Sequence, residues 1–170
     1  LGEQDVMVAH LPRSNAANGV GVADLARLTE VGCVIGLGGD GFTQDIRGEV
    51  PLAALLQRQE RRDPTACPPR SMVALGWEGG ARIVERIAGW RVGRVAPGFA
   101  ADLIALRYEP AVPLLADNAL WHLAMGLPGA SVHDVWVAGQ AVMRDAACKT
   151  LDAERVRNEA ADRFTALWGI

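Results

Sequence analysis

Two polar side chains stand where apolar segments end, and histidine and aspartate are the residue types that commonly handle protons or metal ions in enzymes. The apolar run at residues 6–9 ends on His10, and a second run at residues 34–37 leads into a glycine-rich turn that contains Asp40. Continuous apolar runs of this length are typical of parallel strands buried on both faces. Because the carboxyl ends of parallel strands converge on one face, we expect both side chains at the active-site edge of an α/β barrel.

Helical segments connect and follow these two strands. Residues 22–32 have apolar side chains at helical spacing and end at a glycine, which predicts a strand–helix–strand unit. A second helix is expected over residues 50–60, with Pro51 in its first turn. A third is expected over residues 71–87, with Ser71 as its N-cap, although several glycines weaken that pattern.

The remaining sequence changes to short β segments. Strands are predicted at residues 101–107, 132–138 and 140–143, with Gly139 turning the last two into a hairpin. A short helix is expected at residues 118–125. The segment from Asp152 to Trp168 has the apolar spacing of an amphipathic helix, capped by Asp152 and packed on the scaffold.

Composition excludes some classes of function. The net charge is −3 and the pI is near 5.6, which argues against nucleic acid as a partner because such proteins carry basic patches. No apolar run approaches the roughly 18 residues that would span a bilayer, so no membrane partner is expected. The three cysteines lack C-x-x-C spacing, and Cys33 is expected to be a core residue; a reducing cytoplasm is the expected location.

Three ordered motifs resemble one known family. The first is H-x-P-x-S-N and the second is G-L-G-x-D-G, which contains Asp40; the third comprises GRVAPGFAADLIAL at residues 93–106 and VHDVWVAGQAVMRD at residues 132–145. The H-x-P-x-S-N residues are His10, Pro12, Ser14 and Asn15. Together they are similar to the metal-dependent amidohydrolase superfamily, in its branch of cytosine and guanine deaminases and triazine hydrolases, and most similar to SsnA-like aminohydrolases.

The resemblance implies an α/β fold and an order of parts. Residues 1–88 would be the C-terminal part of a TIM barrel, its last two βα units, and residues 89–150 part of a small β-sandwich. Residues 151–170 would form a terminal amphipathic helix. A complete barrel of this type needs about 250 residues, so this 170-residue chain is expected to be a C-terminal portion of a longer protein.

The resemblance also implies roles for individual residues. Members of the family hold their metal with a His-x-His pair, a further His and an Asp at the end of the eighth strand, and Asp40 falls on that Asp. His10 falls on the seventh-strand His, which lines the substrate pocket, and Thr43 is expected to contact substrate. Gln44 departs from the Ser found in many members. His-x-His is absent from this sequence, and His122 and His133 are expected to be packing or surface residues.

A metal held in this way supplies a nucleophile. Zinc lowers the pKa of a bound water from 15.7 to about 7. In the family the eighth-strand Asp takes the water's proton and passes it to the leaving ammonia, so Asp40 would be both metal ligand and catalytic residue. The parent protein would then be a zinc-dependent aminohydrolase of a small nitrogen heterocycle, a cytoplasmic homodimer that hydrolyses non-peptide C–N bonds. This chain alone is expected to be inactive, because it lacks the ligand histidines.

Other interpretations stay open. From the residues alone, Asp40 between two glycines could simply be a turn residue that binds its own backbone. His10 could be a structural histidine that braces a loop. The whole chain could be a non-catalytic scaffold or partner-binding module, or part of a hydrolase that releases another leaving group, as from a chlorotriazine or a cyclic amide.

Overall fold

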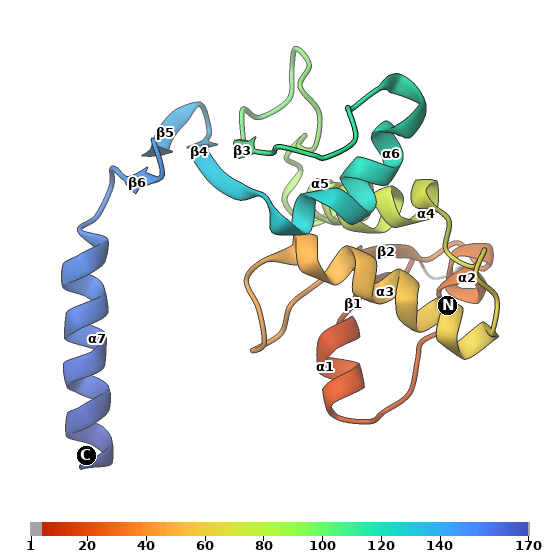
Figure 1. Ribbon diagram of the computed structural model, residues 1–170, viewed down its shortest axis with the longest axis horizontal. Coiled ribbons are helices and arrows are strands. Elements are labelled where there is room, and N and C mark those ends of the chain that lie inside the picture. The colour runs from red at the N-terminus through yellow and green to blue at the C-terminus, as the bar shows by residue number, and fades with distance from the viewer. Residues whose placement is uncertain (1–4, 170) are drawn as a thin grey trace. The chain divides into compact units, whose positions relative to one another are not determined.

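The computed structural model describes residues 5–169 and has the predicted mixed α/β structure. The chain divides into two compact units. The first contains the described residues up to Ala100 together with Tyr108–Ala130, and the second contains Ala101–Arg107 and the described residues from Ser131 onward. Figure 1 shows the elements of each unit, which are described separately below.

The first unit begins with the predicted strand–helix–strand arrangement. Strands β1 (Met7–His10) and β2 (Val34–Leu37) pair in parallel, with His10 opposite Leu37. Helix α2 (Leu25–Glu30) connects them and is shorter than predicted, because the Asp24 side chain caps it by accepting a hydrogen bond from the Arg27 amide. Helix α1 (Pro12–Ala17), which the sequence analysis did not predict, follows β1 directly and has proline at its first position.

Helix α3 (Ile46–Arg61) begins four residues before the predicted start at residue 50. The side chain of Asp45 accepts a hydrogen bond from the Arg47 amide at 3.1 Å and thereby caps the helix earlier. Pro51 consequently lies inside the helix, so its predicted first-turn position is wrong. The buried face of α3 includes Val50 and Ala54, which pack in one hydrophobic cluster with Met72, Val73 and Ala124.

A continuous helical segment crosses β2. It consists of α4 (Pro69–Val73), the π-helical turn η2 (Ala74–Gly79) and α5 (Gly80–Ala88), which together cover the predicted helix at residues 71–87. The segment begins at Pro69 after Pro68, so Ser71 is not the N-cap. A Cβ at Gly79 would overlap the Ile35 carbonyl. Glycine is therefore needed where η2 meets the strand, which explains a residue that weakened the helical pattern.

A second hydrophobic cluster packs α2 and β2 together with η2. It consists of Leu25, Cys33, Ile35 and Leu75, and confirms Cys33 as a core residue. The predicted short helix at residues 118–125 is present as α6 (Ala119–Trp121) and the π-helical turn η4 (His122–Gly126). The 3₁₀ turns η3 (Ala116–Asn118) and η5 (Leu127–Gly129) flank it.

The second unit is a four-stranded antiparallel sheet with the order β3-β4-β5-β6. Its strands are β3 (Leu103–Arg107), β4 (Ser131–Val137), β5 (Gln140–Arg144) and β6 (Ala147–Cys148). The predicted β4–β5 hairpin turns at Ala138 and Gly139, both with positive φ, as a two-residue hairpin turn requires.

Helix α7 (Ala153–Trp168) ends the described chain. The Asp152 side chain caps it as predicted, by accepting a hydrogen bond from the Arg155 amide at 3.0 Å. Every residue of α7 is exposed. The predicted packing of this helix on the scaffold stays a prediction. In the part of the chain that the structure describes, no helix combines the length and the apolar character needed to cross a bilayer.

A buried ion pair ties α1 to α3 within the first unit. The Arg13 Nε donates to Glu49 Oε1 at 2.7 Å, and the Arg13 backbone amide donates to Glu49 Oε2 at 3.0 Å. The Glu49 side chain is fully buried, whereas 44% of the Arg13 side chain is exposed. A buried carboxylate is tolerated only when its charge is paired and its oxygens accept hydrogen bonds, so Glu49 depends on Arg13.

Replacing Arg13 with alanine should lower the free energy of unfolding by about 2–3 kcal/mol, because it leaves a buried carboxylate without its cation. The matched control is Arg27→Ala, which breaks an exposed pair with Glu30 and should cost less than about 1 kcal/mol. Urea denaturation of both variants measures the difference. Equal losses in the two variants would show that the Arg13–Glu49 pair stabilises the fold no more than an exposed ion pair does.

Candidate functional site

The loops that follow β1 and β2 meet at one edge of the parallel pair, as the sequence predicts. The Gly38 amide donates to the His10 carbonyl at 2.9 Å, which continues the ladder just beyond both strands. From the first loop, α1 brings Ser14 into contact with Asp40 in the second loop, at 2.6 Å between Ser14 Oγ and Asp40 Oδ2. The residue that reaches Asp40 from the first loop is therefore Ser14.

Asp40 is an exposed carboxylate held at both oxygens. Oδ2 accepts the Ser14 hydroxyl and Oδ1 accepts the Gly41 amide at 2.8 Å. These hydrogen bonds, that from Ser14 first, lower the pKa of Asp40 below its ordinary value, so the group is ionised at neutral pH. The bond from Gly41 is the local turn contact, yet each oxygen keeps a lone pair that can accept a further ligand.

The turn that presents Asp40 depends on Gly39. The Phe42 and Thr43 amides both donate to the Gly39 carbonyl, at 3.1 and 3.3 Å, so the chain folds back tightly over this residue. A Cβ on Gly39 would overlap the Thr43 carbonyl, whereas a Cβ on Gly41 would meet open space. Asp40 itself has φ of 50°, in the left-handed region that aspartate tolerates better than most residues.

His10 lies at the buried end of β1, and only 4% of the residue is exposed. Its Nε2 is buried and has no hydrogen-bond partner among residues 5–169. Burial lowers the pKa of His10, and the negative charge of Glu49 partly opposes this effect. The ring is therefore neutral at neutral pH. A buried polar atom without a protein partner is rare and calls for a ligand, a water molecule or a structural reason.

Thr43 closes the Asp40 loop and prepares the start of α3. Its Oγ1 accepts a hydrogen bond from the Asp45 amide at 3.0 Å, and Asp45 in turn caps α3. Arg47 braces this corner by binding the Asp45 carboxylate and by donating to the Ala130 carbonyl at 2.8 Å. The Thr43 hydroxyl thus has a local structural partner, and its predicted contact with substrate stays a prediction.

The other two histidines make contacts of their own. His122 is buried, packs against Trp121 in a T-shaped arrangement with ring centroids 5.4 Å apart, and has Nδ1 hydrogen-bonded to the Tyr108 hydroxyl. These contacts fit the predicted packing role, although its Nε2, like that of His10, has no partner among the described residues. His133, on β4 in the second unit, lies 3.2 Å from Asp134 and 3.7 Å from Asp145. Their ligand-type atoms lie within 4.8 Å of one another.

The residues that hold the site in place were not predicted from the sequence. Ser14 was part of a recognised motif but had no assigned role, and Glu49 had no role at all. The sequence gives only a weak indication of a role for Glu49: it is a charged residue beside Val50, on the face of the helix that is buried, where charged residues are unusual. Its partner Arg13 lies 36 residues earlier in the sequence, which no local pattern reveals.

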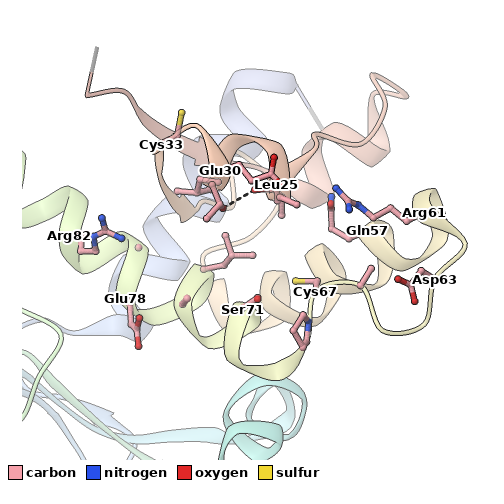
Figure 2. Close-up of a pocket in the computed structure, with 18 residues that line it drawn as sticks. Leu25, Glu30, Cys33, Gln57, Arg61, Asp63, Cys67, Ser71, Glu78 and Arg82 are labelled. Atoms are coloured by element: carbon pink, nitrogen blue, oxygen red, sulfur yellow. Dashed lines mark hydrogen bonds between the residues drawn. The ribbon is translucent and has the colours of Figure 1, made fainter. Parts of the chain in front are cut away.

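A separate cavity of about 420 Å³ lies among α2, β2, the end of α3, α4 and η2. Figure 2 shows Glu78 and Arg82 at one end of it and Gln57, Arg61 and Asp63 at the other. Within the described part of the chain, its lining includes none of the predicted site residues His10, Asp40 and Thr43. The cavity is thus distinct from the edge where the two strand loops meet.

Replacing Gly39 with alanine should distort the Asp40 turn, because the new Cβ overlaps the Thr43 carbonyl. We expect a loss of about 1–3 kcal/mol in the free energy of unfolding and faster hydrogen exchange at the Thr43 amide. Gly41→Ala is the matched control and should change stability by less than about 1 kcal/mol. Unchanged exchange at Thr43 in the Gly39 variant would contradict this account of the turn.

His10 predicts a specific pH dependence of stability. Its pKa in the folded chain is lower than the unfolded value of about 6.5, so the unfolded chain takes up the proton first. Stability should therefore be lost as the pH falls below about 6.5. His10→Gln should lose less stability between pH 7.5 and pH 5.5 than the parent chain, measured by urea denaturation. His133→Gln serves as the control, and a slope in the His10 variant equal to that of the parent chain would refute the prediction.

Comparison with known proteins places the chain in a family. Residues 1–142 match the sequence model of the amidohydrolase family. The chain is 35% identical over 167 residues to a 5-methylthioadenosine/S-adenosylhomocysteine deaminase of Bacillus cytotoxicus, covering 94% of this chain and 37% of that protein. A deaminase of the same name from Bacillus cereus is 34% identical over 165 residues, with the same coverage. The chain thus spans little more than a third of the length of these relatives.

Two solved structures share its fold. An adenosine deaminase from Xanthomonas campestris with bound zinc superposes with a TM-score of 0.80 at 23% identity, covering 99% of this chain and 39% of that one. The atrazine chlorohydrolase TrzN from Arthrobacter aurescens, complexed with zinc, gives a TM-score of 0.74 at 23% identity, covering 94% of this chain and 36% of that one. These likenesses and the family match agree with the resemblance of the three sequence motifs: the chain belongs to the amidohydrolase family.

Proposed function

We propose that this chain is the part of a zinc-dependent aminohydrolase that supplies the carboxylate ligand of the metal and one wall of the substrate pocket. The observation that carries the proposal is Asp40: an ionised carboxylate, hydrogen-bonded at both oxygens, at the end of β2 and in the motif position of the family's ligand. The relatives named as deaminases support a reaction that hydrolyses a non-peptide C–N bond of a nitrogen heterocycle.

Each element would have a defined place in the complete enzyme. β1 and β2 would be the seventh and eighth strands of a TIM barrel, and residues 1–88 would complete its last two βα units. Residues 89–150 would contribute to a small β-sandwich, and residues 151–170 would form the terminal helix. The parallel pairing of β1 with β2 and the helical segments after each strand support this assignment.

The residues present fit a divalent metal. Asp40 offers a carboxylate oxygen with a free lone pair on an exposed side chain, and carboxylate oxygen is an ordinary ligand of zinc. When bound, the metal would lower the pKa of a water molecule towards neutrality. The remaining ligands, histidines in the family, would come from outside this chain.

The chain's own residues would then handle the proton and the substrate. The Asp40 carboxylate accepts a proton from the attacking water and returns it to the leaving nitrogen, because it is ionised at neutral pH and exposed. His10 would line the substrate pocket, and its Nε2, which has no partner among residues 5–169, would be the atom available to a ligand once the pocket is complete. The Thr43 hydroxyl, in the same loop as Asp40, would contact the substrate. The complete enzyme acts as a homodimer on a small molecule in the cytoplasm.

A hydrolase with another leaving group is the second candidate, and the likeness to the chlorohydrolase TrzN favours it. The same activated water can attack a ring carbon that bears an amino group or a chloride. Parallel assays for released ammonia, released chloride and a ring-opened acid separate these reactions. Chloride release without ammonia would favour the second candidate.

Metal content tests the proposal directly. The protein extended to the full length of its relatives should hold about one zinc ion per chain by elemental analysis, and Asp40→Asn should lose at least about nine-tenths of it. Asp45→Asn is the matched control, because asparagine still caps α3 and should leave the metal in place. If the extended protein holds no metal, Asp40 is a turn residue and the chain is a scaffold or binding module instead. If the Asp40 variant keeps its metal, Asp40 is not the ligand and the proposed function fails.

A further inference from the structure

We propose that Ser14 is a positioning residue for the Asp40 carboxylate and that Asn18 directs the Ser14 proton towards it. The inference rests on the proposed function, since it assumes that Asp40 is the metal ligand. It concerns residues in the loop after β1, which act on a carboxylate in the loop after β2. No role for Ser14 or Asn18 follows from the Asp40 motif itself.

The hydroxyl of Ser14 has one proton, and the structure shows where it goes. Asn18 Nδ2 donates to Ser14 Oγ at 3.3 Å and so occupies a lone pair of the hydroxyl oxygen. A serine within a helix often donates to the carbonyl four residues earlier, which here is that of His10. Here the Ser14 hydroxyl instead lies 2.6 Å from Asp40 Oδ2. A carboxylate oxygen can only accept, so Ser14 donates its proton to Asp40.

This hydrogen bond fixes an exposed side chain that would otherwise rotate. The Gly41 amide holds only Oδ1, and it belongs to the same turn as Asp40. Ser14 holds Oδ2 from a separate element, so the two bonds together restrain both side-chain dihedrals of Asp40. Hydrogen bonds to an ionised carboxylate are the stronger ones, and the 2.6 Å separation is typical of them. The lone pairs that remain therefore point in defined directions.

Ser14 can do this because α1 is itself held rigidly. Only 5% of Ser14 is exposed, and its neighbour Arg13 is bound by the buried Glu49 of α3. The chain of contacts thus runs from the core through α1 to the Asp40 carboxylate. Outer residues that orient metal ligands typically change metal affinity 10- to 100-fold when they are mutated.

The test uses the full-length protein loaded with zinc. Ser14→Ala should speed zinc release to a chelator by about 10- to 100-fold, and Asn18→Ala by about 3-fold, while the unfolding midpoint of the metal-free protein stays near that of the parent. Ser71→Ala is the matched control, because Ser71 is an exposed serine on α4 and belongs to neither of the loops that follow β1 and β2. A crystal structure of metal-free Ser14→Ala should show Asp40 in more than one rotamer.

The outcomes separate this inference from the proposed function. If Ser14→Ala releases zinc at the parental rate while Asp40→Asn loses the metal, Ser14 has no positioning role and the proposed function stands. If Ser14→Ala releases zinc faster only because the metal-free protein is destabilised to match, Ser14 is merely structural and the inference is overturned. If Asp40→Asn retains its zinc, the proposed function and the inference both fail.

Discussion

The arrangement of the site depends on a carboxylate that water does not reach. Glu49 lies on the buried face of α3, where a carboxylate requires a paired cation and hydrogen-bond donors. The Arg13 guanidinium and the Arg13 backbone amide supply them. That requirement fixes the first turn of α1 against α3. Ser14 follows Arg13 directly, so the position of the Asp40 carboxylate traces back to the neutralisation of one buried charge. The buried Arg13–Glu49 pair thus determines where the exposed Asp40 carboxylate lies.

Close backbone contacts are the second constraint. Gly79 lets the π-helical turn η2 lie against the Ile35 carbonyl, and Gly39 lets the Asp40 loop fold back on Thr43. Both glycines remove a Cβ where two backbone segments touch, although neither has a positive φ. The first contact places the helical layer on β2, and the second places the carboxylate at the end of the same strand. Two glycines therefore fix the contacts of β2: Gly79 along its side and Gly39 at its end.

The sequence patterns correctly predicted those helices, strands and turns that depend on interactions between residues close together in the chain. Apolar runs, turn residues and helix caps act over a few positions. The sequence therefore predicted the strand that ends at His10, the strand before Asp40, the β4–β5 hairpin and the Asp152 cap. The start of α3 was misplaced because Pro51 suggested a first turn while the Asp45 cap acted earlier. Glu49 and Ser14 escaped prediction because their partners lie 36 and 26 residues away, a separation that only the folded chain closes.

The link between the two loops has a consequence for how such a site can be altered. A loop that orients its own functional group can be exchanged between proteins as an independent module. Here the Asp40 carboxylate accepts a hydrogen bond from Ser14 in the segment after β1, and that segment is held in turn by the Arg13–Glu49 pair with α3. Loop grafting at this edge must therefore move residues 10–18 and 38–49 as a single unit. The smallest unit that can be exchanged at this edge consists of the two loops and the first turn of α3.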